Sequence, residues 1–217
     1  MANTERDERI IEFLDKFTYA TTTQLASVFF NDSLRAAQIR LKKLRESKAV
    51  RYVSIGKDYP FIYCLHGQHS RQVLHHVAIV EAFRTLRMQG VVDFTPLLCR
   101  EFKFEGKPVR FVADAFFTLK MRGGAQLVAF LEIERKVVRT SYSKVAHYEA
   151  FYLSGAYKNE WWYEVGRAQG RDVFPRIVVQ TGRPEKYAEV VRQQKNVKLP
   201  WQFVSAPGEI LKGGVVL

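Results

Sequence analysis

Cysteine and long apolar runs are scarce in this chain. Only two of its 217 residues are cysteines. Cys64 and Cys99 stand far apart and form no CxxC pair, which excludes a disulfide framework and a zinc ribbon. No apolar run is long enough to span a membrane, and the N-terminus lacks the charged, apolar and cleavable regions of a secretory signal. We therefore expect a cytoplasmic protein with no membrane partner.

The sequence lacks the motifs of two classes of enzyme that act on nucleotides or nucleic acids, and it has fewer acidic than basic residues. The sequence has no GxxxxGK[ST] segment, which argues against a P-loop ATPase. Tyr59 is not followed by a histidine triad with metal-ligand spacing, which argues against a relaxase. The chain has 22 acidic and 34 basic residues, a net charge of +12. This excess favours a polyanionic partner, and we expect double-stranded DNA.

The N-terminal part of the sequence predicts three helices followed by a β-hairpin. Thr4 suits a helix N-cap because acidic residues fill the turn after it. Thr21 with Gln24 fits a capping box, and Asp32 or Ser33 can cap a third helix. The expected elements are helices over 4–17, 21–29 and 33–47 and strands over 50–55 and 61–65, together a winged helix-turn-helix domain over 1–68.

From about residue 70 helices and strands alternate. The segment "SRQVLHHVAIVEAFRTLRMQG" predicts an amphipathic helix, and three strand candidates follow, divided by the turn-like segments "EGKP" and "MRGG". A helix over 142–153, a buried strand in "FPRIVVQTG", a helix beginning at Pro184 and a strand in "LPWQFVSA" complete the pattern. The strands are expected over 97–104, 109–119 and 126–134. The expected fold class is therefore α+β, with an αβββαβ mixed-sheet domain over 69–217.

Basic side chains concentrate in the third helix and the hairpin. Residues 1–31 carry a net charge of −2, whereas residues 32–57 carry +6. A helical wheel places Leu34, Ala37, Leu41 and Leu44 on the core side of the third helix. We expect Arg35 and Ile39 to read base edges, Lys42, Lys43 and Arg45 to contact phosphates, and Arg51 and Lys57 to reach the adjacent backbone or minor groove. The alternative is a solvated basic helix in a domain used for protein contacts.

Three acids in neighbouring predicted strands suggest a metal site. The strand in "LVAFLEIERK" ends with Glu132 and Glu134, which point to one face because side chains alternate along a strand. Asp114 lies in the otherwise apolar "VRFVADAFFTL", where an unpaired acid is costly. Carboxylate oxygens suit Mg²⁺ or Mn²⁺, and a cation held by Asp114 and Glu132 can activate water. The alternative for Glu132 and Glu134 is that the strand has reached solvent.

These residues resemble a known family. A helix followed by three strands, a helix and a strand, with Asp in the second strand and Glu in the third, resembles the PD-(D/E)xK nuclease fold. The segments "RFVADAFFTL", "LVAFLEIERK", "SKVAHYEAFY" and "RIVVQTGRPEKY" are similar to the replication-relaxation family of plasmids and other mobile elements, whose members place a winged helix before a nuclease-like domain. The resemblance implies that the nuclease Asp falls on Asp114, the strand Glu on Glu132 and the helix Glu on Glu81.

The sequence departs from the nuclease pattern at two positions. Ala113 stands where the motif has Pro, and Glu134 stands where it has Lys, a residue that steadies developing charge. Lys136 and Lys144 are substitutes. Lys144 shares a helix stripe with Tyr148 and so faces the sheet, and the resemblance makes it the better candidate, because some nuclease-like proteins carry the lysine on that helix. It is either a catalytic lysine or a structural residue, with its stem packed over Tyr148 or in an ion pair with Glu132 or Glu134. We expect Asp114, Glu132 and Lys144 to converge at one edge of the sheet.

Three functions remain open. The first is a DNA-binding protein of a plasmid or other mobile element that acts in replication, copy control or conjugation, with a nuclease-like domain whose site is retained but chemically silent. The second is a Mg²⁺-dependent endodeoxyribonuclease that the winged helix targets. A weaker third function is a transcriptional regulator whose C-terminal domain makes it a homodimer. The Glu at position 134 favours the first over the second.

Overall fold

The chain divides into two compact units of mixed α and β structure. The computed structural model describes residues 4–56, 59–66, 72–120, 126–135, 140–168, 174–211 and 215–217. One unit comprises Met1–Arg84 and the other Thr85–Leu217. The expected α+β class is confirmed by the seven α-helices and two sheets of this part of the chain. Within it, no helix combines the length and the apolar character needed to cross a membrane.

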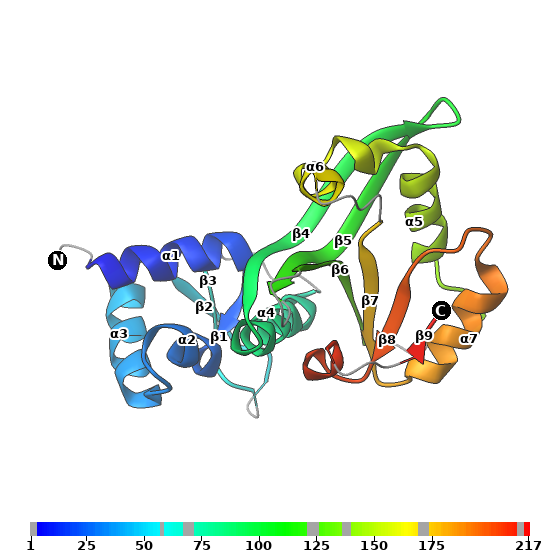
Figure 1. Cartoon of the computed structure of the whole chain (residues 1–217). Coiled ribbons are helices and arrows are strands. Elements are labelled where there is room, and N and C mark those ends of the chain that lie inside the picture. Colours follow the sequence, from blue (N-terminus) through cyan, green and yellow to red (C-terminus); the bar gives the residue numbers. More distant parts are fainter. Residues whose placement is uncertain are drawn as a thin grey trace. The chain divides into compact units, whose positions relative to one another are not determined.

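The N-terminal unit follows the predicted sequence of helices and strands (Figure 1). Thr4 and Thr21 each cap a helix through a capping box, with Asp7 and Gln24 as the reciprocal partners. Ser33 caps the third helix through its side chain. The strand order is β1-β3-β2, with both pairs antiparallel. The elements are α1 (Glu5–Phe17), β1 (Ala20–Thr21), α2 (Thr22–Phe29), α3 (Leu34–Glu46), β2 (Arg51–Val53) and β3 (Ile62–Cys64).

The prediction of which side of α3 faces the core is largely correct. Ala37, Leu41 and Leu44 are buried, as the helical wheel predicts. Leu34 is 44% exposed and does not belong to the core. It is the first residue of the helix, so no earlier helical turn covers its side chain. One face of the helix is therefore apolar and buried, and the opposite face is free to carry charge.

Helix α4 (Val73–Met88) begins within the N-terminal unit. The Gln24 side-chain amide donates a 2.9 Å hydrogen bond to the Val77 carbonyl. Phe83 packs on Phe17, with ring centroids 5.0 Å apart, and on Phe13 at 5.9 Å. These contacts place the division between units after Arg84, whereas the sequence suggested a boundary at residue 68.

The second unit is built on one six-stranded sheet in the order β4-β5-β6-β7-β8-β9. The first three strands form an antiparallel meander, β6 to β8 are parallel, and β9 returns antiparallel at the edge. This is the mixed sheet that the sequence predicts, with an additional short helix, α6. The elements are β4 (Val91–Phe104), β5 (Lys107–Lys120), β6 (Gln126–Glu134), α5 (Lys144–Leu153), α6 (Trp161–Ala168), β7 (Arg176–Thr181), α7 (Pro184–Gln194), β8 (Trp201–Val204) and β9 (Val215–Val216), with 3-10 turns η1 (Ala156–Asn159) and η2 (Pro207–Glu209).

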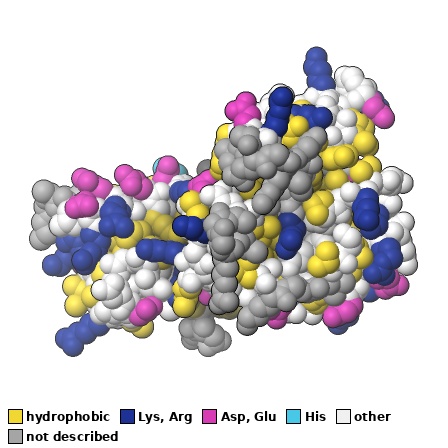
Figure 2. Space-filling view, viewed as in Figure 1, with side chains coloured by type: hydrophobic (Ala, Val, Ile, Leu, Met, Phe, Trp, Pro, Cys, Tyr) yellow, Lys and Arg dark blue, Asp and Glu magenta, His cyan; other side chains and the backbone are white. Residues whose placement is uncertain are grey.

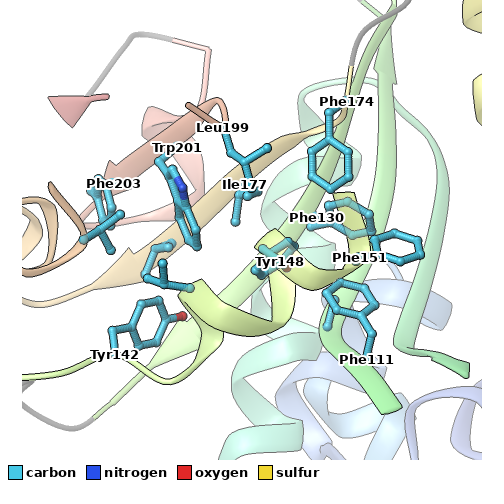
Figure 3. Packing of buried hydrophobic residues seen from close by; sticks show 14 of the residues in the cluster. Phe111, Phe130, Tyr142, Tyr148, Phe151, Phe174, Ile177, Leu199, Trp201 and Phe203 are labelled. Carbon is cyan, nitrogen blue, oxygen red and sulfur yellow. The ribbon is translucent and has the colours of Figure 1, made fainter. Parts of the chain in front are cut away.

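An aromatic core joins α5 to the sheet (Figure 3). Phe111 of β5 stacks on Phe151 of α5, with centroids 4.7 Å apart. Tyr148, one turn earlier on the helix, meets Phe111 at 4.9 Å and Phe130 of β6 at 5.4 Å. Tyr148 also contacts Trp201 of β8 at 5.3 Å, so the helix spans strands on both sides of β6. These contacts fix the face of α5 that meets the ends of β5 and β6.

The alternation of side chains along β5 is interrupted near Asp114. Phe111, Ala113 and Phe116 belong to one core cluster although an uninterrupted strand would place Phe116 on the other face. On the neighbouring strand Leu97 lies between the pairs Pro96↔Ala115 and Leu98↔Ala113 and has a φ of 52°, a left-handed value that is uncommon for leucine. The irregularity therefore involves both strands at the same level of the sheet.

Candidate functional site

A buried carboxylate, Glu132, is the centre of the candidate site. Glu132 follows Phe130 at strand spacing on β6, so its side chain points to the face that α5 covers. The residue is 0% exposed. Its Oε1 accepts a 2.7 Å hydrogen bond from the Tyr148 hydroxyl, and its Oε2 lies 2.8 Å from Lys144 Nζ. Helix α5 thus supplies both partners from positions four residues apart, which share a helix face.

Lys144 holds a fixed position at the start of α5. Besides its ion pair with Glu132, its Nζ donates a 2.7 Å hydrogen bond to the backbone carbonyl of Val112 on β5. Its side chain is 22% exposed, so the stem is covered while the head is held between the two strands. The sequence left a catalytic lysine and a structural ion pair as alternatives, and the ion pair with Glu132 is present.

Asp114 occupies the neighbouring strand at the same level. It is 8% exposed, and its Oδ2 accepts a 2.7 Å hydrogen bond from the backbone N–H of Ile133 on β6. The regular β5–β6 pairing ends one residue away, at Ala115↔Leu131. The carboxylate therefore takes over the role of a backbone acceptor where the ladder stops. The charge of Asp114 raises the pKa values of both Glu132 and Lys144, and Lys144 Nζ lies 2.8 Å from Glu132, so the acid on β5 acts on the same cluster.

The charges in this cluster are strongly coupled. Burial and then the nearby charge of Asp114 raise the pKa of Glu132 to about 8, against the opposing effects of Lys144 and Tyr148. Burial alone would lower the pKa of Lys144, but the charges of Glu132 and Asp114 outweigh it and raise that pKa. Burial and the charge of Glu132 raise the pKa of Tyr148 well above its usual value. Tyr148 is therefore a neutral hydroxyl donor over the whole physiological range.

Glu134 extends the site along the same face of β6. It is half-buried at the end of the strand. Its charge, after burial, raises the pKa of Tyr187 on α7 to about 12 and contributes to the raised pKa of Tyr142. Glu132 and Glu134 lie two residues apart on one strand, so their side chains point to the same face, and the charges of both raise the pKa of Tyr142. The strand has not simply reached solvent at these positions.

Glu81 belongs to the N-terminal unit. Its carboxylate is 3.3 Å from the Gln24 side-chain amide and 2.9 Å from the Arg84 guanidinium. These contacts account for its conformation by interactions within that unit. The assignment of the family's helix Glu to this position therefore stays a prediction. Lys136, the other lysine considered, lies outside the described residues.

The donor chemistry of the site fits a hard divalent cation, but its contacts favour an ion-pair network. Asp114 and Glu132 offer the carboxylate oxygens that Mg²⁺ and Mn²⁺ prefer. Among the described residues no group of three or more His, Cys, Asp or Glu side chains is arranged to hold a metal. Lys144 Nζ already lies 2.8 Å from Glu132 Oε2, a position that a cation would have to share. A cation bound here would supply Lewis-acid activation of water, and Asp114 and Glu132 are the residues that would hold it.

Three tyrosine hydroxyls around the acids were not predicted as parts of the site. Tyr148, Tyr142 and Tyr187 come from α5, the segment before it and α7. The sequence signal for Tyr148 was its position four residues after Lys144, which was interpreted as core packing. Tyr187 reaches the site through the packing of α7 and Tyr142 through the segment before α5, and the sequence pattern specifies neither position.

A second surface with functional character lies on α3 and the adjacent hairpin of the N-terminal unit. Its predicted DNA-contact residues Arg35, Ile39, Lys42, Lys43, Arg45 and Arg51 are all exposed. Figure 2 shows acidic side chains along α1 and Lys and Arg side chains beside them on the α3 side. Lys42 is 3.9 Å from Glu46, a weak surface pair, so its charge remains available. Lys57, the remaining predicted contact, lies outside the described residues.

Arg40 differs from the other basic residues of α3. It turns toward α1 and forms a bidentate ion pair with Asp7, which is 0% exposed. Its hydrogen bonds to the Asp7 carboxylate lower the pKa of that acid to about 2. Arg40 therefore anchors α3 to α1 and is not part of the exposed basic face.

No protein family matches this sequence, and no curated protein matches it. Among solved structures, the chain is similar to the crystal structure of protein VC1899 from Vibrio cholerae, with 12% sequence identity and a TM-score of 0.36. The match covers 96% of this chain and 55% of that one, so the chain spans about half the length of that protein. A likeness of this strength carries no argument about fold or function.

Proposed function

We propose that this chain is a double-stranded DNA-binding protein of a plasmid or other mobile element, acting in replication, copy control or conjugation. In this proposal the N-terminal unit is a winged helix-turn-helix that docks on DNA through α3. The second unit is a nuclease-like scaffold of the replication-relaxation type whose acidic site is chemically silent. The exposed basic face of α3 is the observation that carries the proposal.

The geometry of α2 and α3 supports a helix-turn-helix. Four residues separate the two helices, and Asn31 and Asp32 within them have φ values of 49° and 63°. Two successive left-handed residues reverse the chain sharply, and Asn and Asp tolerate that conformation better than most residues. The following strands β2 and β3 form the antiparallel hairpin expected of a wing. In such domains the second helix enters the major groove and the wing contacts the flanking backbone.

The distribution of charge supports DNA as the ligand. Residues 32–57 carry eight basic and two acidic side chains. The buried face of α3 is apolar and Arg40 is held by Asp7, so the remaining cations of the helix face outward. Arg35 and Ile39 lie near the start of the helix, where base contacts are made, and Lys42 and Lys43 one turn later are suited to phosphates.

Replacement of Lys42 and Lys43 by Ala tests this proposal. Each lysine lost from a phosphate contact removes one released counterion, so affinity should fall for every duplex and the slope of log K against log salt should flatten by up to about two. Fluorescence anisotropy with a labelled duplex over a salt series measures both quantities. The matched control is Lys186→Ala with Lys195→Ala, which removes the same charge from α7 and the residue that follows it. Unchanged affinity and slope in a folded Lys42/Lys43 variant would refute DNA docking through α3.

A metal-dependent endonuclease is the second candidate, and the convergence of Asp114, Glu132 and Lys144 favours it. A catalytic site of this kind should be stabilised by Mg²⁺ or Mn²⁺, because a ligand bound only by the folded state raises the melting temperature. Asp114→Asn should abolish that shift together with any cleavage of plasmid DNA. In the silent site metal has no effect, and Asp114→Asn lowers stability without changing activity. Nicking that depends on Mg²⁺ and disappears in Glu132→Ala would establish the nuclease and overturn the silent site.

A further inference from the structure

The hairpin beside α3 presents aromatic rings to solvent. Tyr52 is 44% exposed, Tyr59 53% and Phe61 55%. They account for three of the five large hydrophobic side chains exposed in the described part of the N-terminal unit; the other two are Leu34 and Ile39 on α3. Exposed aromatic residues gathered on one element are unusual on a surface that has no partner, and they indicate a binding site.

These rings are held rigidly by the backbone and by one another. Tyr52 lies on β2 opposite Tyr63 of β3. The backbone of Phe61 is fixed because its carbonyl accepts hydrogen bonds from Thr22 at the start of α2, from the backbone N–H at 3.0 Å and from the hydroxyl at 3.3 Å. The Tyr52 and Phe61 rings meet edge to face, with centroids 5.2 Å apart and an interplanar angle of 81°. A ligand that stacks on such a surface orders little that is not already ordered.

The surroundings of the rings are cationic. The Arg45 guanidinium lies over the Tyr52 ring, 5.2 Å from its centroid. Aromatic rings bordered by arginine form the platform on which single-stranded nucleic acids stack their bases, with the cations meeting the phosphates. An apolar protein segment could pack on the rings but would offer no negative charge to Arg45.

We propose that Phe61 and Tyr52, with Arg45, stack on unpaired bases, so that the N-terminal unit binds DNA where a duplex opens into single strands. This inference rests on the proposed DNA binding by α3 and deepens it by naming the substrate class. Within an uninterrupted duplex the faces of the bases are covered by their neighbours, and only unpaired bases offer a free face to a ring. Helix α3 holds the duplex, and the hairpin next to it receives the opened strand.

The test compares two labelled probes of the same sequence in the full-length chain. One is a closed duplex whose ends are capped by hairpins, and the other carries a short central bubble of unpaired bases. The wild type should bind the bubble more tightly than the closed duplex. Phe61→Ala should lose roughly ten-fold in affinity for the bubble, within the range measured for single stacking contacts, and should bind the closed duplex as the wild type does. Tyr52→Ala is a second variant with the same expectation.

Two further variants separate stacking from apolar contact and from general surface effects. Phe61→Trp keeps a stacking face and should retain the preference for the bubble, whereas Phe61→Leu keeps apolar area without a ring and should lose it. Leu153→Ala removes an exposed apolar side chain of the second unit and should change nothing. A fluorescent purine analogue placed in the bubble should be quenched by the wild type and not by Phe61→Ala.

The outcomes distinguish this inference from the proposal on which it rests. Equal affinity of the wild type for the two probes, or equal losses on both probes in Phe61→Ala, would overturn base stacking while leaving duplex binding by α3 intact. Failure of the wild type to bind either probe would overturn both. Full affinity of Phe61→Leu for the bubble would show that the rings make only apolar contacts, which also contradicts the inference.

Discussion

Replacement of Glu132 by Gln examines a buried carboxyl group whose pKa is strongly raised. Glutamine matches a protonated glutamic acid in shape, and its amide oxygen can still accept the Tyr148 hydroxyl. It does not titrate. The two proteins should therefore differ in how their stability depends on pH, and this difference isolates Glu132 from the other titratable groups.

The sign and size of the effect follow from the raised pKa. An unfolded chain releases the Glu132 proton near pH 4.5, whereas the folded protein retains it until about pH 8. The wild type thus has the full contribution of this group below pH 4.5 and loses stability as the pH rises to 8. A shift of this size corresponds to a loss on the order of 5 kcal/mol, at about 1.36 kcal/mol per pKa unit. The free energy of unfolding of Glu132→Gln should lack that component of the decline.

Tryptophan fluorescence during urea unfolding measures the relevant transition. The three tryptophans are Trp161, Trp162 and Trp201, and all lie in the second unit with Glu132. The signal therefore reports that unit alone, which matters because a protein of two units need not unfold in a single step. Stabilities of both proteins are compared at intervals from about pH 3 to pH 9, which spans the titration of Glu132 in the unfolded and folded states, and their difference is plotted.

Two results would refute this reasoning. A constant difference between the proteins over the whole range would mean that the pKa of Glu132 is not raised. A difference that moves the other way, with the wild type gaining on the variant as the pH rises through 4.5, would mean that Lys144 outweighs burial and holds Glu132 ionised.

Two further substitutions have defined outcomes. Asp7→Asn should cost about 2 kcal/mol of unfolding free energy near neutral pH, because Arg40 lowers the pKa of Asp7 to about 2. This stabilisation is complete above pH 3.8 and is lost as the pH falls toward 2. A cost that does not change with pH in circular-dichroism unfolding would contradict the prediction. Tyr148→Phe should lower the free energy of unfolding by about 1–2 kcal/mol, because Glu132 loses its hydroxyl donor. It should also raise the pKa of Glu132 above 8, because the Tyr148 hydrogen bond lowers that pKa. An unchanged pH profile of stability would show that the hydroxyl does not interact with the carboxylate.

Local signals in the sequence predicted the helices of the N-terminal unit well. The capping boxes at Thr4 and Thr21 depend on residues three positions apart, which the sequence displays directly. For α4, the amphipathic pattern shows that one face is buried and does not show what covers it. Gln24 and Phe13, which contact this helix, are distant from it in sequence, and no sequence pattern around them predicts these contacts.

The candidate site was predicted where strand and helix periodicity were sufficient. Parity placed Glu132 and Glu134 on one face, and the spacing of Lys144 and Tyr148 placed both on the face of α5 that meets the sheet. Periodicity did not predict the irregularity at Asp114, where the carboxylate binds a backbone N–H beyond the last regular pair. Whether the site binds metal depends on fine geometry that residue types alone do not determine.

Burial on both faces of β5 determines how this strand tolerates mutation. In an ordinary half-buried strand polar substitutions are accepted at every second position, so a complete substitution scan shows alternating sensitive and permissive sites. All seven residues from Ala113 to Leu119 are buried. A scan of this strand should therefore give an unbroken block of sensitive positions that resembles a central parallel strand, although both neighbours of β5 run antiparallel to it. An interpretation based on variation alone would assign β5 the wrong type of sheet, because residues on both faces of this part of the strand are buried.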